Sequence, residues 1–563
     1  MEKHYRKMIK DTENRVVKSL QIQVMDEASP RYGGFEDATG IVQAKFSIYR
    51  VASMIACYCN EDTIYYRNAV VFERILLGLE YIRRVQHENG LFDYITCNFN
   101  SAPDTAFCVK KLLPIYRYLD SVNKGEGLTE EEREIFGRVG QIVHDGAHGM
   151  LEGGFHTPNH RWAIASVLMM CGKLFGEKEL TEAAGAYLNE GIDCNEDGEF
   201  AEKSAGNYNR VNNDAMIMLS EATGDVTYEK YAVKNLTMML TYWEPDGSVF
   251  TANSTRFDKD LLCFPKDYYL EYLQMGMKYG NEDFLRMANT IFELVDEKNI
   301  TSPDFLIWMM LHPAYRTFEY KGTYAREDFR RFYPESGIVR AQQGRFTYTV
   351  MRDKSNFFYL HDGGLKLEMK VCGSFCEHRA FKAESLEQLG EGEYHLSQVM
   401  HGWYYLPWKE KPSTSNWWKM DNASREKKLG PDMHIDVWVK EVPDGVDVRV
   451  KTDGVDGAPW RIELAFTGAK FFSCEDSEMP LDGSEVIVVR KGEARMSAGD
   501  DTLVIGPCFG EHHFTEGKED SERKNAGAAT LYLTDYTGFD RTISIRNQRS
   551  IYEEKLSGLI RRN

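Results

Sequence analysis

Two polar clusters in the first half of the chain hold residue types that bind anions and move protons. Residues 156–162 contain Asn159 and His160, and residues 204–214 contain Tyr208 among several asparagines. Amide, imidazole and phenol groups make a poor core, but together they can bind an acidic sugar and transfer its protons. Two smaller polar clusters lie at residues 98–104 and 254–257.

These groups suit an elimination reaction. Asn159 and a nearby Arg can neutralise a uronate carboxylate, which makes the neighbouring C5 proton more acidic. A Tyr or His then removes that proton, and the Tyr208 hydroxyl can protonate the departing O4. A second interpretation stays open, in which Thr157 is a helix N-cap, Pro158 begins the helix and His160 is an ordinary hydrogen-bonded polar group.

Helices are expected to position these clusters. Up to about residue 315 the apolar residues recur at helical spacing, as in 41–59, 65–85, 104–119, 162–174 and 228–242. After residue 332 they alternate, with turn residues between the runs, as in 346–351, 436–439, 446–450 and 486–489. We therefore predict a helical domain over residues 1–320 and an antiparallel β-sandwich over residues 321–563.

The helical half also repeats itself. Turn-like glycines followed by an apolar residue occur at spacings of 57, 56, 52 and 49 residues, at Gly33, Gly90, Gly146, Gly198 and Gly247. A period near fifty fits a helical hairpin, which must pack on its neighbours to bury its apolar face. About six such hairpins closing on themselves form an α/α toroid whose loops line one mouth. An open solenoid has the same period and is not excluded, but we expect the closed ring, because about six units are present and their loops carry polar clusters.

The composition of the chain limits the kinds of partner that it is expected to bind. The 563 residues carry a formal net charge of −19, which argues against nucleic acid as a partner. The first residues are charged, and no window approaches the roughly twenty apolar residues of a membrane span, so we expect a cytoplasmic protein without a membrane partner. The sequence leaves open whether copies of the chain associate.

Metal and cofactor motifs are weak. The eleven cysteines are expected to be free thiols, and the pair Cys372 and Cys376 lacks a second pair at zinc-site spacing. No HExxH, P-loop or dinucleotide-binding motif occurs. We predict no cofactor and no metal ligand, and leave open whether a divalent metal braces the sandwich.

The pair Asn159 and His160, Tyr208 about fifty positions later, a helical toroid and a following sandwich resemble the heparinase II/III-like and alginate-lyase-like polysaccharide lyases. The resemblance implies that Asn159 neutralises the uronate carboxylate, and that His160 and Tyr208 act as base and acid. It also implies a further His from the sandwich, for which His401 and His361 rank together and His378 ranks lower. A glycosaminoglycan is the first substrate expected from this resemblance.

Substrate binding is assigned to polar residues near the predicted mouth and to an aromatic stretch suited to sugar stacking. These residues are Asn100, Asp104, Arg161, Asn207, Arg210, Asn213, Trp403 and Tyr405.

Two other functions remain open at this level. A toroid can hydrolyse glycosides, here uronides, with two carboxylates, and Asp104 and Asp214 lie in clusters suited to that role. A carbohydrate-binding scaffold without catalysis would also show the helical repeat.

Overall fold

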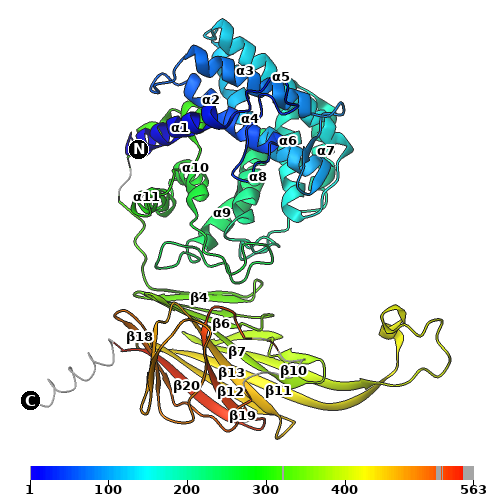
Figure 1. Ribbon diagram of the computed structural model, residues 1–563, viewed down its shortest axis with the longest axis vertical. Helices are drawn as coiled ribbons and strands as arrows, with labels where there is room; N and C mark the ends of the chain where they lie inside the picture. The colour runs from blue at the N-terminus through cyan, green and yellow to red at the C-terminus, as the bar shows by residue number, and fades with distance from the viewer. Residues whose placement is uncertain (1, 320–321, 515–521, 523, 549–563) are drawn as a thin grey trace, which may run out of the picture. The chain divides into compact units, whose positions relative to one another are not determined.

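The computed structural model describes residues 2–319, 322–514, 522 and 524–548, and it divides into two compact units (Figure 1). The helical unit comprises the chain up to Tyr242 together with Ser248–Ala325. The strand unit comprises Trp243–Gly247 and the chain from Arg326 onward. Within the described residues, no helix combines the length and the apolar character needed to cross a membrane.

Paired helices form the helical unit. An inner series (α2, α4, α6, α8, α10) packs neighbour on neighbour, and each inner helix also packs on the outer helix that follows it in the chain (α3, α5, α7, α9, α11). The five helical segments expected from the apolar spacing are confirmed as α2, α3, α4, α6 and α9. The helices are α1 Glu2–Ile22, α2 Ala44–Tyr58, α3 Ala69–Val85, α4 Ala102–Lys124, α5 Glu130–Gly149, α6 Pro158–Phe175, α7 Lys178–Leu188, α8 Tyr208–Thr223, α9 Thr227–Met239, α10 Tyr269–Tyr279, α11 Glu282–Glu297, α12 Leu306–Leu311 and α13 Ala314–Thr317.

Contacts of α1 with α10 and α11 close the ring. The His4 ring of α1 stacks on Phe292 of α11 with centroids 4.0 Å apart, and its Nδ1 lies 3.1 Å from the Tyr269 hydroxyl of α10. Lys3 of α1 pairs with Asp296 of α11 at 2.9 Å. An open solenoid would leave these helices apart, so the unit is a closed α/α toroid.

Glycine turns join successive hairpins of the ring. Gly33, Gly90, Gly198 and Gly247 all have φ between +81° and +96°. At Gly90 a Cβ atom would lie 1.9 Å from the Asp145 carbonyl of α5, so only glycine permits this approach. The Gln86 amide binds both sides of the contact, donating to the Gly90 carbonyl at 2.8 Å and to a carbonyl of α5 at 3.1 Å.

One predicted turn is wrong. Gly146 lies inside α5, where an added Cβ would meet Val109 and Thr105 of α4, and the positive-φ glycines of its repeat are Gly153 and Gly154. The sequence pattern misplaced this turn because a glycine that lets two helices pack closely and a glycine that makes a turn have the same letter.

Two sheets form the strand unit in the described part of the chain. One has the strand order β15-β14-β17-β18-β20-β12-β11-β10-β9, and the other has β16-β19-β13-β7-β6-β5-β4-β3 with β8 beside β7. Pairing is antiparallel except between β16 and β19. The strands are β3 Phe329–Tyr333, β4 Ile338–Gln343, β5 Phe346–Met351, β6 Phe358–Asp362, β7 Leu365–Phe375, β8 His378–Ala380, β9 Ser385–Gly390, β10 Glu393–Tyr405, β11 Lys427–Val442, β12 Gly445–Asp453, β13 Pro459–Thr467, β14 Phe471–Cys474, β15 Glu478–Pro480, β16 Val486–Val488, β17 Ala494–Ala498, β18 Asp501–Gly506, β19 Ala529–Tyr536 and β20 Asp540–Asn547.

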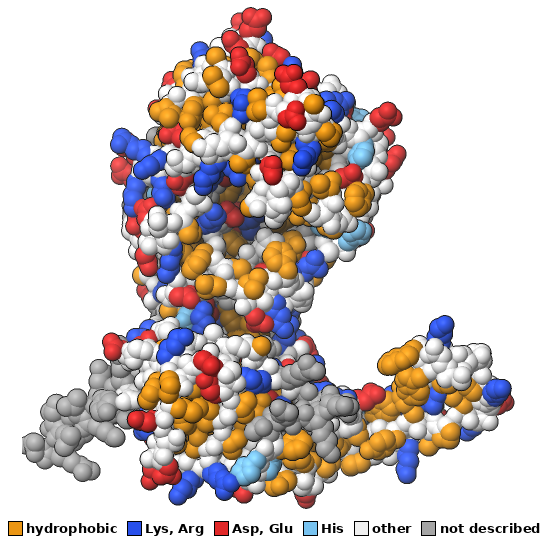
Figure 2. All heavy atoms as spheres, viewed as in Figure 1, with side chains coloured by type: hydrophobic (Ala, Val, Ile, Leu, Met, Phe, Trp, Pro, Cys, Tyr) orange, Lys and Arg blue, Asp and Glu red, His pale blue; other side chains and the backbone are white. Residues whose placement is uncertain are grey.

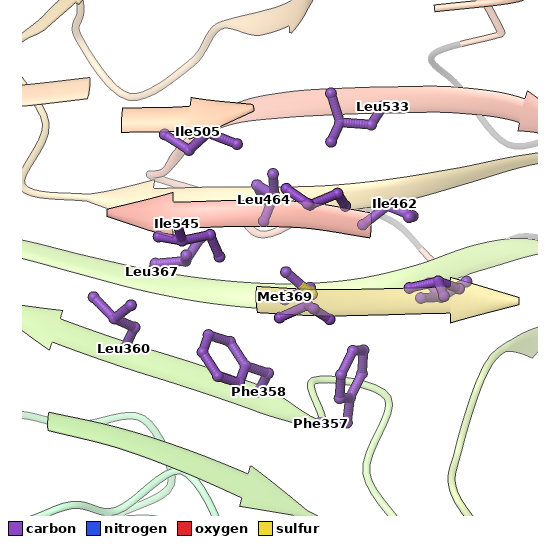
Figure 3. Close-up of a cluster of buried hydrophobic side chains, with 14 of the residues drawn as sticks. Phe357, Phe358, Leu360, Leu367, Met369, Ile462, Leu464, Ile505, Leu533 and Ile545 are labelled. Carbon is purple, nitrogen blue, oxygen red and sulfur yellow. The ribbon is translucent and has the colours of Figure 1, made fainter. Parts of the chain in front are cut away.

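The core of the strand unit lies between its two sheets. Alternate residues of strands from both sheets turn inward, as the period of a half-buried strand requires. Figure 3 shows Phe358 and Met369 of one sheet in the same cluster as Ile505 and Ile545 of the other. The predicted antiparallel β-sandwich is therefore confirmed. The helical unit also holds a small ribbon of β1 (Phe92–Tyr94) and β2 (Asn98–Ser101), which leads into α4.

Candidate active site

The first turns of the inner helices lie together at one end of the helical unit. Lys45 in α2 donates from Nζ to Asp104 Oδ1 in α4 at 3.3 Å. The Phe107 ring of α4 stands edge-on to His160 in α6, with centroids 6.1 Å apart. Unpaired backbone N–H groups give each helix N-terminus a partial positive charge, so several N-termini at one end favour an anion. Figure 2 shows that one face of the helical unit is hollowed, with acidic and basic side chains in the hollow.

Asn159, at the second position of α6, is fully buried. Its side-chain Nδ2 donates to Glu202 Oε1 at 2.8 Å and to Thr157 Oγ1 at 3.0 Å, and its backbone N–H donates to Glu202 Oε2 at 3.1 Å. The N–H groups expected to meet a uronate carboxylate are thus bound within the protein. Thr157 stands at the N-cap but makes no capping hydrogen bond with its side chain, so simple capping does not explain this motif.

His160 follows one position later and is half-buried. Burial lowers the pKa of His160 to about 4, although the charge of nearby Asp104 acts in the opposite direction. His156, Arg256 and Lys45 lie close enough for their charges to act with burial. At neutral pH the ring is therefore an uncharged imidazole, and its buried Nδ1 makes no hydrogen bond within the described residues.

Tyr208 begins α8, where its backbone N–H donates to Ser204 Oγ at 3.0 Å. The Arg256 guanidinium carbon lies 5.3 Å from the centre of the Tyr208 ring, and Phe257 stands edge-on to the same ring. Arg256 Nε in turn lies 3.3 Å from Glu202 Oε1. Asn159 and Tyr208, on neighbouring inner helices, are thus linked through Glu202 and Arg256.

Two residues of α8 that were predicted to bind substrate interact with other residues of the helical unit. Burial would lower the pKa of Arg210, but the charges of Asp267 and Glu271 raise it. Asn213 is fully buried and donates from Nδ2 to Asn235 Oδ1 of α9 at 2.9 Å. Both side chains interact with residues of the protein itself.

The remaining predicted substrate-binding residues of the helical unit lie in strand β2, just before α8 and in the first turn of α6. Asn100 is exposed in β2 with a φ of +46°, and its backbone N–H donates to Asp93. Asn207 is the residue before α8 and makes no capping hydrogen bond with its side chain. Arg161 is paired with Glu190 at 2.5 Å and covers the Trp162 ring at 4.0 Å. The charge of Arg161 is therefore already neutralised by an ion pair.

The two carboxylates of the hydrolase alternative differ in depth. Asp104 accepts from Ser101 Oγ at 2.7 Å and from Asn98 Nδ2 at 2.9 Å, in addition to Lys45. Asp214 pairs at 2.8 Å with Lys110, which lies six residues beyond Asp104, or about 9 Å along α4. The carboxylates therefore sit at different levels, each in an ion pair.

His361 lies in β6 of the strand unit and is 5% exposed. Its Nδ1 lies 3.0 Å from Glu244 Oε2, and its Nε2 lies 3.0 Å from the Gly363 carbonyl. Both partners are acceptors, so both ring nitrogens lie at hydrogen-bond distance from groups of the protein. The same Glu244 binds Arg340 at 2.7 Å. Within the strand unit His361 thus lies against a buried ion pair, with both nitrogens engaged there.

His401 lies on an exposed hairpin of the strand unit. Beyond it, the last residues of β10 and the first of β11 pair only with each other, as the yellow hairpin in Figure 1 shows. His401 Nδ1 lies 2.9 Å from Asp432, and its side chain is 68% exposed. Trp403 and Tyr405 stand edge-on to each other at 4.7 Å, with Lys427 Nζ 3.6 Å from the centre of the Trp403 ring. His378, in β8, is half-buried, and burial lowers its pKa.

Sequence reasoning missed three residues that connect the site. Lys45 lies in the first turn of an inner helix, and asking which cations begin such helices would have found it. Arg256 belongs to the polar cluster at residues 254–257, to which the sequence assigns no role. Glu202 is buried and accepts two of the three hydrogen bonds that Asn159 donates, and no local signal marks a carboxylate that acts from another repeat.

Comparison with known proteins gives a fold without a sequence family. No protein-family model matches the chain, and no curated protein matches its sequence. The structure of a Paenibacillus xanthan lyase is similar, with a TM-score of 0.57 and 10% identity, over 96% of this chain and 56% of that one. The chain thus spans just over half the length of that lyase.

Chondroitin AC lyase from Streptomyces coelicolor A3, in complex with chondroitin sulphate, is similar with a TM-score of 0.54 and 12% identity. That match covers 97% of this chain and 80% of the lyase. Identities this low establish architecture alone, and they do not single out a heparinase II/III-like subgroup. The α/α toroid followed by an antiparallel β-sandwich is therefore the fold that this chain shares with polysaccharide lyases.

Proposed function

We propose that this chain is a lyase that cleaves a uronic-acid-containing polysaccharide or oligosaccharide by β-elimination at the first turns of its inner helices. The observation that carries the proposal is the setting of His160. A neutral imidazole stands among helix N-termini, near Lys45 and Arg256. Such a site attracts an anion and at the same time holds a group that accepts a proton.

The reaction distributes its charges over these residues. Lys45, Arg256 and the helix N-termini neutralise the uronate carboxylate, which acidifies the C5 proton. The His160 imidazole takes that proton, and the electron pair left on C5 forms the C4–C5 double bond as the C4–O4 bond breaks. The Tyr208 hydroxyl protonates the departing O4 and recovers its proton through solvent.

Asn159 acts in this scheme as a positioning residue. Its amide holds Glu202, Glu202 holds Arg256, and Arg256 lies over the Tyr208 ring. In this scheme Lys45 and Arg256, and not the Asn159 amide, neutralise the carboxylate of the substrate.

The strand unit is proposed to add substrate contacts through its exposed hairpin. His401 is the sandwich histidine that we retain as a candidate proton carrier, because it is exposed, whereas both ring nitrogens of His361 are used in the core. Trp403 and Tyr405 offer faces for sugar stacking. A glycosaminoglycan is the first substrate to test, since the similar chondroitin AC lyase was solved with chondroitin sulphate.

Hydrolysis of uronides by paired carboxylates is the second candidate. It is less favoured because Asp104 and Asp214 lie at different depths.

The deciding experiment follows ultraviolet absorbance beside a reducing-sugar assay, with hyaluronan, chondroitin, heparosan, heparan sulfate, alginate and glucuronan fragments. Absorbance of the conjugated unsaturated uronate that rises with new reducing ends establishes the lyase and identifies its substrate. New reducing ends without absorbance would move the assignment to hydrolysis. Binding of a fragment without any product would leave a carbohydrate-binding scaffold.

A further inference from the structure

A histidine pair and a carboxylate meet on the outer side of the helical unit, apart from the first turns of the inner helices. His144 and His148 are one turn apart near the end of α5, so they share a face of that helix. Glu177 stands just before α7, next to the turn that ends α6. None of the three takes part in the proposed elimination.

The three side chains converge on one point. His144 Nε2 lies 2.9 Å from Glu177 Oε1, and His148 Nε2 lies 2.7 Å from Glu177 Oε2. One potential ligand atom from each residue lies within 4.8 Å of the other two. A tetrahedral zinc ion with ligands about 2.0–2.2 Å away fits between such atoms after a small outward movement. The side chains are 30–38% exposed, so an ion and a water molecule can reach them.

The backbone and the neighbouring rings hold this arrangement in place. Gly176 ends α6 in the left-handed conformation with a φ of +73°, and the Glu177 backbone N–H donates to the Gly172 carbonyl at 2.9 Å. Phe175 stands edge-on to the His144 ring, with centroids 5.1 Å apart. The three groups are thus positioned before any ion arrives.

A fourth residue, Asp145, lies near the second ring nitrogen of His144. Asp145 Oδ1 lies 3.5 Å from His144 Nδ1, and Arg83 and Gln141 hold the Asp145 carboxylate at 2.8 Å and 2.7 Å. A neutral His144 that donates from Nε2 to Glu177 would turn its Nδ1 lone pair toward this carboxylate, which is unfavourable. A metal on Nε2 puts the proton on Nδ1, where it faces Asp145.

We propose that His144, His148 and Glu177 bind one divalent transition-metal ion of the zinc type, with water as the fourth ligand. Two imidazoles and one carboxylate select zinc, nickel or copper over magnesium and calcium. The ion joins the end of α5 to the turn between α6 and α7, so its role is to brace two neighbouring hairpins of the ring. The site is independent of the elimination chemistry.

The test is calorimetric titration of the full chain, stripped with a chelator, with zinc chloride and separately with magnesium chloride. We expect one zinc ion per chain and no magnesium binding. The double variant His144→Ala/His148→Ala should lose at least about 100-fold in zinc affinity, and Asp145→Asn should lose about 10- to 100-fold. His87→Ala is the matched control, because His87 pairs with one carboxylate, Asp93, at 2.9 Å.

Glu177→Gln keeps the size and shape of the side chain and guards against a variant that fails to fold. It should also weaken zinc binding while the circular dichroism of the chain stays unchanged. Tyr208→Phe should bind zinc like the unaltered chain, which separates this proposal from the elimination reaction. Equal zinc affinity of the unaltered chain and the Glu177→Gln variant would overturn the site, as would absence of zinc binding by the unaltered chain.

Discussion

Asn159 holds Glu202 through two hydrogen bonds, one from its side-chain amide at 2.8 Å and one from its backbone N–H at 3.1 Å. Burial raises the pKa of Glu202, against the effect of these hydrogen bonds and of the Arg256 charge. The amide and the guanidinium therefore offset part of the cost of burying a carboxylate that lies almost wholly inside the protein. Any change at Asn159 reaches Arg256, and through it Tyr208, without touching substrate.

Replacing Asn159 by Asp should disconnect this chain of contacts. The new carboxylate would face Glu202 at hydrogen-bond distance, and loss of a hydrogen bond to a charged group costs about 1.5–3 kcal/mol. We expect turnover to fall about 10- to 100-fold. The double variant Asn159→Asp/Glu202→Gln, which restores a donor and an acceptor, should recover part of the loss in steady-state assays. Equal activity of the single and double variants would contradict the positioning role.

Tyr208→Phe should abolish elimination while the chain stays folded. A positioned acid contributes about 10²- to 10⁴-fold to the rate, so kcat should fall by that factor with little change in KM. Tyr536→Phe, at a 46% exposed position of the strand unit, removes a hydroxyl far along the chain and should leave turnover unchanged. Near-normal turnover of Tyr208→Phe would rule out its role as the acid.

Lys45→Met should weaken binding of the anionic substrate. Lys45 is the cation in the first turn of α2, and we expect kcat/KM to fall about tenfold or more, with a weaker dependence on salt. Lys178→Met removes the same charge from an 87% exposed position and serves as the control. If both variants respond alike to salt, the effect comes from overall charge and not from the site.

The pH dependence should reflect the buried setting of His160. Because its pKa is about 4, the ring stays in its basic form well below the ordinary value of 6.5, and kcat/KM should decline only as the pH approaches 4. Between pH 6.5 and 4 the unfolded chain binds the proton more readily than the folded one, so the His160 contribution to stability falls with acidification. Rate profiles and thermal unfolding across this range measure both effects, and an acid limb of kcat/KM near 6.5 would exclude His160 as the base.

Glu244→Gln should destabilise the strand unit. It removes the charge that pairs with the buried Arg340 guanidinium and with His361, and breaking a buried pair costs about 3–5 kcal/mol. Although burial opposes it, Arg340 holds the pKa of Glu244 well below its usual range. Urea unfolding followed by circular dichroism should show the loss in the transition of the strand-rich unit.

The control for Glu244 is Asp540→Asn, which breaks an exposed pair with Arg449 and should cost about 1 kcal/mol or less. Similar losses in the two variants would mean that the Glu244 pair contributes no more than a surface ion pair.

Much of the fold was predictable because it rests on local patterns. Helical spacing identified α2, α3, α4, α6 and α9, and alternation identified strands of the sandwich, since both follow from which residues face a core. The closed ring was predicted from the number of repeats and their polar loops, and it is confirmed. The pairs that close it, such as His4 with Phe292, were not predictable, because they are distant in sequence and a period describes only neighbouring repeats.

The site was predictable in its residue types and less so in its connections. His160 and Tyr208 stood out as polar and aromatic groups at helix starts, and the structure places both there. The hydrogen bond from the Asn159 amide to Glu202 was not predictable from the pattern, because the two residues are 43 positions apart. Asn213 misled for the same reason, since a buried Asn that bonds another helix has the same letter as one that binds sugar.

Closure of the ring changes how the helical unit can come apart. In an open array the terminal repeats have one neighbour and fray first, so exchange of backbone protons is fastest at the two ends. Here α1 contacts α10 and α11 as well as α2, so the first helix has neighbours on both sides. The ring therefore has no terminal repeat to fray, and local opening must break two interfaces wherever it begins.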